Sequence, residues 1–158
     1  MMLCRRLSLT SILSLVTLCT ISAGPPRSKS AGSIELTSLT PEAGSTVDRS
    51  SVITAQLRFA IDNFRKNQDR YQISVKFQSI ESRAVTFSKG PEDVVMLGDR
   101  SGSITMVYPL HRVWDDPKLR KPIVMYFYLH ERTGKRDTVV LDKTEEIRFA
   151  VRESEPPA

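Results

Sequence analysis

The two histidines, His111 and His130, are the residues whose type most directly suggests metal chemistry. A zinc site needs three or four nitrogen, sulfur or carboxylate ligands that converge on one point. The two imidazoles stand near opposite ends of one apolar row, 123–129, so they are not expected to meet. We therefore predict that both histidines lie on the surface, and that the chain binds no metal and no cofactor.

The serines and carboxylates do not form a recognisable catalytic arrangement. Ser101–Ser103 (SGS) lacks the Gly-x-Ser-x-Gly pattern of a nucleophile elbow. Asp115 and Asp116 are adjacent, and adjacent side chains of an extended chain point apart, which does not suit a paired acid and base. With Glu92 and Asp93 they could supply oxygens to calcium, but no ligand loop of the usual spacing surrounds them. The sequence thus predicts a protein that is not an enzyme.

The 158-residue chain begins with the pattern of a secretory signal peptide. Arg5 and Arg6 form a positive start, Leu7–Leu18 is uncharged and rich in leucine, and Ala23 supplies the small residue of a cleavage site. We predict that residues 1–23 are removed and that the remainder is exported to the periplasm or the extracellular space. The alternative is a retained membrane anchor, because the apolar stretch is at the lower limit of a spanning segment.

Both cysteines, Cys4 and Cys19, belong to this leader, so the exported part has no disulfide and no thiol nucleophile. Acylation of Cys19 would add a lipid anchor, but Leu18 is bulky where such sites have a small residue. Loss of Arg5 and Arg6 lowers the net charge from +5 to +3. This mild surplus does not predict a nucleic-acid partner.

Polar and apolar residues alternate through most of the exported part. Because successive side chains of a strand point to opposite faces, each alternating row predicts a strand with one buried face. The rows run over 33–37, 53–61, 71–77, 104–110, 123–129 and 147–151. About seven short strands of this kind predict a single antiparallel β-sandwich over residues 33–152. A flexible linker over 24–32 and a disordered tail over 153–158 are expected to flank it.

Segment 51–66 fits two structures. Four apolar residues of this segment also lie at helical spacing: Ile53, Leu57, Ile61 and Phe64. Ser50 or Ser51 could cap such a helix. Five alternating positions in succession favour a strand. The predicted core contains Ile53, Leu57, Phe59, Ile73, Val75, Phe77, Ile104, Met106, Ile123, Met125, Phe127, Ile147 and Phe149.

The segment Leu39–Val47 (LTPEAGSTV), followed by a strand from Val52, resembles the opening of bacterial immunoglobulin-like domains. Those domains often begin with a strand, then Pro-x-x-Gly-Ser-x-Val, then a long second strand. The resemblance implies an exported domain of immunoglobulin-like connectivity with an adhesive, scaffolding or accessory binding role, and it supplies no catalytic residue. Trp114 stands in a connection before the 123–129 row, so the Cys-Trp-Cys spacing of antibody domains is not matched.

Immunoglobulin-like connectivity would bring the connections 63–70 and 131–137 to one end of the sandwich. They carry one aromatic residue and six cations, which together we call the basic tip: Phe64, Arg65, Lys66, Arg70, Arg132, Lys135 and Arg136. Asp69, Glu131 and Asp137 offset part of this charge, and Phe64 is expected to be exposed. Since loops on a rigid scaffold often bind partners, the basic tip is predicted to dock an anionic envelope polymer or an acidic protein surface. The simpler interpretation is a pair of solvated loops.

Trp114 beside Lys118–Lys121 (KLRK) is a second candidate, because an aromatic ring with basic neighbours can bind sugars or anions. The interpretation that we favour is that the ring covers the bottom of the core while the cations are solvated.

The sequence as a whole predicts a non-catalytic, exported binding or accessory module of the cell envelope, which acts through contacts with a protein or an envelope polymer. A small periplasmic enzyme, or a carrier of a ligand or metal, is the alternative. A structural subunit of a surface assembly is a third class, which an unpaired strand edge would favour.

Overall fold

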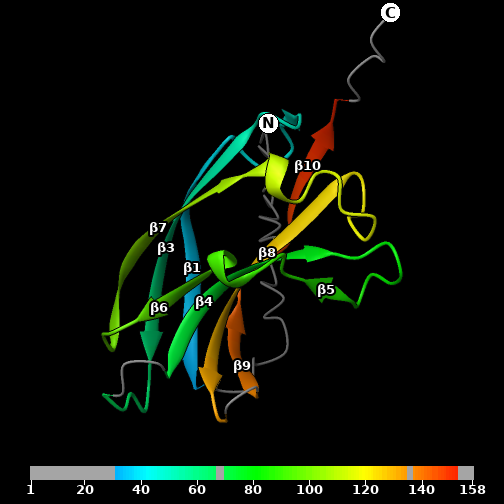
Figure 1. Ribbon diagram of the computed structural model, residues 1–158. Coiled ribbons are helices and arrows are strands. Elements are labelled where there is room, and N and C mark those ends of the chain that lie inside the picture. The colour runs from blue at the N-terminus through cyan, green and yellow to red at the C-terminus, as the bar shows by residue number, and fades with distance from the viewer. Residues whose placement is uncertain (1–30, 67–69, 135–136, 153–158) are drawn as a thin grey trace, which may run out of the picture.

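The computed structural model describes residues 31–66, 70–134 and 137–152, which form ten strands in two packed sheets (Figure 1). Two short 3₁₀ turns, η1 (Pro91–Asp93) and η2 (Leu110–Arg112), interrupt the strands. The prediction of an all-β sandwich is confirmed, and within these ranges no helix is long or apolar enough to cross a membrane. The predicted leader 1–23, the Cys19 lipid anchor, the linker up to residue 30 and the tail 153–158 lie outside the described residues.

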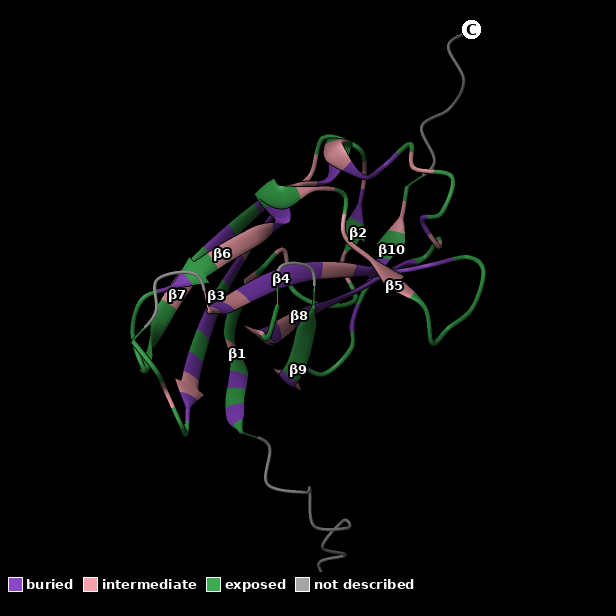
Figure 2. Cartoon of the chain, turned by 60° about the horizontal axis from the view of Figure 1, so that its bottom comes forward, coloured by how far each residue is buried: buried purple, intermediate pink, exposed green. Residues whose placement is uncertain are grey.

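The small sheet contains β1 (Gly32–Thr40), β3 (Val52–Ile61) and β7 (Ser101–Pro109), all antiparallel, in the order β1-β3-β7. Alternate residues of β3 are buried, from Ile53 to Ile61, and Figure 2 shows this alternation along β1 and β3. The strand interpretation of 51–66 is therefore confirmed over 52–61. These alternate buried residues form the face of β3 that packs against the opposite sheet.

The large sheet is built around β8 (Ile123–Arg132), which pairs along one edge with β4 (Tyr71–Gln78). Its other edge pairs with β10 (Ile147–Val151) near the start and with β9 (Thr138–Lys143) near the end. Three shorter strands complete the sheet: β2 (Thr46–Val47) beside β10, and β5 (Thr86–Phe87) and β6 (Val94–Leu97) beside β4. Only β2 and β10 are parallel among these pairs.

The strand order gives the connectivity that places the loops. β1, β3 and β7 share one sheet while β4, β8 and β10 share the other, so the chain crosses between the sheets after β3 and after β7. The structure has more strands than the predicted seven because the four strands β2, β5, β6 and β9 lie outside the alternating rows.

The core lies between the sheets, and every predicted core residue except Ile104 is buried. Ile104 is half-buried because β7 is an edge strand, so neighbouring strands cover it on one side only. The connection after β7 closes one end of the core with Leu110, Val113, Trp114 and Leu119. Trp114 is 8% exposed, which confirms that the ring covers the core.

Candidate partner-binding surface

The two connections that carry the basic tip meet at one end of the sandwich, as predicted. Tyr71, which begins β4, is the register partner of Glu131 near the end of β8. Beyond this pair, the backbone N–H of Arg132 donates to the carbonyl of Arg70 (2.6 Å). The ends of β3 and β8 both lie at the bottom of Figure 1. The described parts of the β3–β4 and β8–β9 connections therefore lie at the same end of the sandwich, joined by this hydrogen bond.

Tyr71 organises the β3–β4 connection from beneath. Its side chain is 2% exposed, and its hydroxyl donates to the carbonyl of Asn63 (3.3 Å) and accepts from the N–H of Arg65 (3.2 Å). Phe64 stacks on the Tyr71 ring at 5.2 Å between centroids. The prediction that Phe64 is exposed is wrong: it is half-buried, because the ring packs against the core through Tyr71.

The cations of the basic tip are not equally available. Arg65 and Lys66 are exposed and Arg132 is half-exposed. Arg70 donates from Nε to Oε1 of Glu131 (2.7 Å), and its Nη2 lies 2.5 Å from the same oxygen. Glu131 thus neutralises Arg70, and the pair is a brace between β4 and β8 rather than a free charge. Lys135, Arg136 and Asp69 lie outside the described residues.

Arg100 adds a cation that the sequence interpretation missed. It lies between β6 and β7, and its Nη2 donates to the carbonyl of Asp62 (3.2 Å). With Asp62, Asn63, Phe64 and Arg65 it lines a hollow of about 540 Å³. This position follows from the antiparallel pairing of β6 with β4, because β6 ends beside the start of β4. The alternating rows of the sequence do not include β6, so they carry no signal for Arg100 at this end.

The two histidines occupy different environments. His111 is exposed, as predicted, but His130 is 5% exposed, so its predicted surface position is wrong. The His130 ring stacks on Tyr128 at 5.6 Å, and its Nε2 lies 2.9 Å from Oγ of Ser74. Burial first, and then the positive charge of Lys76, lower the pKa of His130 to about 4. The ring is therefore neutral at physiological pH.

The carboxylates considered for calcium binding do not converge. Asp93 is buried, and its Oδ2 accepts from the N–H groups of Lys89 (2.5 Å) and Gly90 (3.3 Å), while Arg112 lies 3.4 Å from Oδ1. The other three form ion pairs: Glu92 with Arg112, Asp115 with Arg49 and Asp116 with Lys89. Within the described ranges, no three His, Cys, Asp or Glu side chains are grouped to hold a metal ion.

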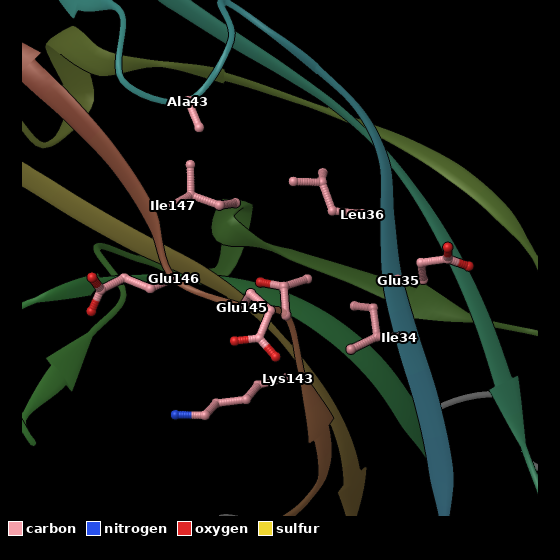
Figure 3. Close-up of a pocket in the computed structure, with 9 residues that line it drawn as sticks. Ile34, Glu35, Leu36, Ala43, Lys143, Glu145, Glu146 and Ile147 are labelled. Atoms are coloured by element: carbon pink, nitrogen blue, oxygen red, sulfur yellow. The ribbon is translucent and has the colours of Figure 1, made fainter. Parts of the chain in front are cut away.

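A lateral opening separates the edges of the two sheets (Figure 3). Leu36 of β1 and Ile147 of β10 point toward each other across this cavity of about 360 Å³, and Ala43 lies at its upper end. Lys143 and Glu145 lie at its lower end. Apolar side chains from β1 and β10 face polar and charged residues of the segment between β9 and β10, so the lining of this opening is mixed.

Comparison with known proteins gives only distant structural likeness. No family model and no curated protein matches the chain. The chain is similar to a β-glucosidase from Listeria innocua in complex with glucose, with a TM-score of 0.40 and 13% identity over 77% of this chain and 16% of that chain. The isofagomine complex of the same enzyme gives a TM-score of 0.39 at 14% identity, with the same coverage. The chain thus spans about a sixth of the length of these enzymes.

Proposed function

We propose that this protein is a non-catalytic, exported binding module of the cell envelope, of immunoglobulin-like type, that engages an anionic partner through its basic tip. The observation that carries the proposal is the convergence of Arg65, Lys66 and Arg132 from two connections onto one hydrogen-bonded base. The leader pattern of residues 1–23 supports export.

The arrangement suits recognition of an anionic surface. Arg65 is held by its backbone contact to Tyr71, so its side chain starts from a fixed position. Guanidinium groups bind carboxylates and phosphates through paired hydrogen bonds. An ammonium group adds a positive point charge without this paired geometry. Both groups act best on loops that a rigid scaffold supports. The partner is accordingly an acidic protein surface or an anionic envelope polymer.

The test is a crosslinking capture from the native cell envelope with the purified chain and two matched charge reversals. The tip variant is Arg65→Glu with Lys66→Glu, and the control is Arg58→Glu with Arg152→Glu, which also reverses two exposed cations. We expect one component to be captured by the control and by the parent chain but not by the tip variant. Equal capture by both variants contradicts the proposal.

The edge of β7 favours a structural subunit as a second candidate function. β7 is nine residues long, carries no charged residue and pairs among the described strands with β3 alone. Such an edge can accept a strand from another chain. If this function holds, Thr105→Lys with Val107→Lys should abolish assembly measured by sedimentation, while the tip variant should not.

A further inference from the structure

A second basic site lies at the opposite end of the large sheet from the basic tip. We call it the basic cleft, a cavity of about 520 Å³ lined chiefly by Gln78, Arg83, Arg120, Lys121, Tyr126 and Arg148. Gln78 ends β4, whereas the basic tip lies where β4 begins. The two sites share no residue and are separated by the length of that strand.

Cations exceed carboxylates around the basic cleft. Its one lining carboxylate, Glu146, accepts from the Tyr126 hydroxyl (2.9 Å) and pairs with Arg148. Arg83, Arg120 and Lys121 make no close ion pair with a described carboxylate, unlike Arg49, Arg70 and Arg112 elsewhere in the molecule. Glu146 lies within electrostatic reach of Arg83, so the cavity holds one carboxylate against four cations: Arg83, Arg120, Lys121 and Arg148.

The chain that carries these cations is fixed in place. The N–H of Arg120 donates to the carbonyl of Gln78 (3.2 Å), and Nε2 of Gln78 donates to the carbonyl of Arg83 (2.9 Å). Gln78 itself is 5% exposed. The Lys121 ammonium lies 4.4 Å from the centroid of the Trp114 ring, and this cation–π contact restrains the side chain. A site that is ordered before binding loses less conformational entropy when a ligand enters.

We propose that the basic cleft binds a phosphate-bearing ligand, with Arg83 and Arg120 as its principal contacts. The planar guanidinium group matches the geometry of a phosphate, and two such groups in one cavity favour a multiply charged anion over a single carboxylate. The cavity falls within the size range of small-molecule sites, about 300–1,000 Å³, so there is room for the organic body attached to the phosphate. A phosphorylated glycan and a lipid headgroup share this chemistry. The proposal stands independently of the basic tip.

The test compares two variants in amide NMR titrations. The cleft variant is Arg83→Glu with Arg120→Glu, and the tip variant, Arg65→Glu with Lys66→Glu, is its matched control. Glucose phosphate is the probe and glucose is the neutral control. To separate the two sources, phosphatidylcholine vesicles with and without phosphatidic acid form a second arm, read by cosedimentation. Binding to vesicles but not to glucose phosphate assigns the site to a lipid headgroup, and the reverse assigns it to a phosphorylated glycan.

We expect saturable shifts centred on Arg83, Arg120 and Arg148, which weaken with salt and are absent with glucose. The cleft variant should bind at least about tenfold more weakly, while the tip variant keeps the parent affinity. Equal affinity of the cleft variant and the parent overturns the proposal, as do non-saturating shifts spread over all exposed cations. If the double reversal perturbs the fold, Arg83→Gln with Arg120→Gln gives the same comparison. Because each site has its own variant, failure here leaves the proposed function of the basic tip intact.

Discussion

Oγ of Ser74 lies 2.9 Å from Nε2 of His130, and both side chains are buried on the outer face of the large sheet. In a two-sheet sandwich this face would be expected to meet solvent. Here the Tyr128 ring covers the imidazole from one side, and Val140 of β9 is its register partner on the next strand. The outer face thus holds a buried, neutral histidine outside the main core.

This burial makes stability depend on pH in one direction. The folded-state pKa of His130 is lowered to about 4, by burial first and then by Lys76, whereas an unfolded histidine titrates near 6.5. Below that value the unfolded chain takes up a proton that the folded chain resists. The contribution of the neutral His130 to stability is therefore fully present above about pH 6.5, and it is lost as the pH falls toward 4. We expect a loss of about 2 kcal/mol between about pH 7 and about pH 5.

Urea unfolding at a series of pH values measures this contribution. His130→Gln removes the titrating ring and should flatten the dependence in that window, although its stability at neutral pH will be lower. His111→Gln replaces an exposed histidine and should keep the parent slope. If the parent and His130→Gln show the same slope, the neutral buried histidine is not the cause.

Tyr71→Phe should loosen the β3–β4 connection without unfolding the domain. The hydroxyl bonds the carbonyl of Asn63 and the N–H of Arg65, so its removal leaves two partly buried groups without this partner. The expected loss of stability is about 1 kcal/mol, and the amide of Arg65 should exchange faster with solvent. Tyr128→Phe is the matched control, because no described group bonds that hydroxyl. Equal exchange at Arg65 in both variants would show that Tyr71 does not anchor the connection.

Glu131→Gln should weaken the brace at the base of the basic tip. The side chains of Arg70 and Glu131 are 26% and 23% exposed, so solvent screens the pair only in part. We expect a loss of about 1 kcal/mol that shrinks at high salt. Glu35→Gln makes the same change in the Arg58–Glu35 pair, in which Nη1 of Arg58 lies 3.6 Å from Oε2 of Glu35 and both side chains are more than 60% exposed. This control should lower the stability by at most a few tenths of a kcal/mol. Similar losses for both would contradict the brace.

The sequence predicts the two-sheet fold because alternation and burial agree along the main strands. Segment 52–61 is assigned correctly since the same five residues that alternate also face the core. The alternation of polar and apolar residues does not predict β6 and β9, because each contains two adjacent valines: Val94–Val95 in β6 and Val139–Val140 in β9. Pairing with β4 and β8 makes these segments strands, and that is a long-range effect.

The candidate binding surfaces are harder to predict from the sequence than the strands are. Topology alone places 63–70 beside 131–137, so the meeting of the two connections is predictable. Charge counting does not reveal that Glu131 neutralises Arg70, or that Phe64 is covered by its stack on Tyr71. Arg83 and Arg120 are far apart along the chain, and their sharing of one cavity depends on the hydrogen bonds of Gln78. Side-chain partners therefore decide which cations remain free.

Gly44→Ala should destabilise the protein through the backbone alone. Gly44 has a φ of +86°, and the N–H of Ser45 donates to the carbonyl of Glu42 (3.1 Å), so Gly44 occupies the left-handed position of a four-residue turn. The N–H of Gly44 also donates to the carbonyl of Arg148 (2.7 Å), which fixes this turn to β10. A Cβ at Gly44 would meet no atom within 4 Å, so any penalty reflects conformation rather than a clash.

The expected loss for Gly44→Ala is about 1–2 kcal/mol, measured by urea unfolding. Gly44→Asn should cost less, because asparagine tolerates the left-handed region better than alanine does. Gly98→Ala is the matched control: its added Cβ also meets nothing within 4 Å, and its φ is not positive, so the change should stay within about 0.5 kcal/mol. If alanine is tolerated equally at both positions, the turn does not need its glycine. In that case the Pro-x-x-Gly spacing at Pro41–Gly44 reflects something other than backbone geometry.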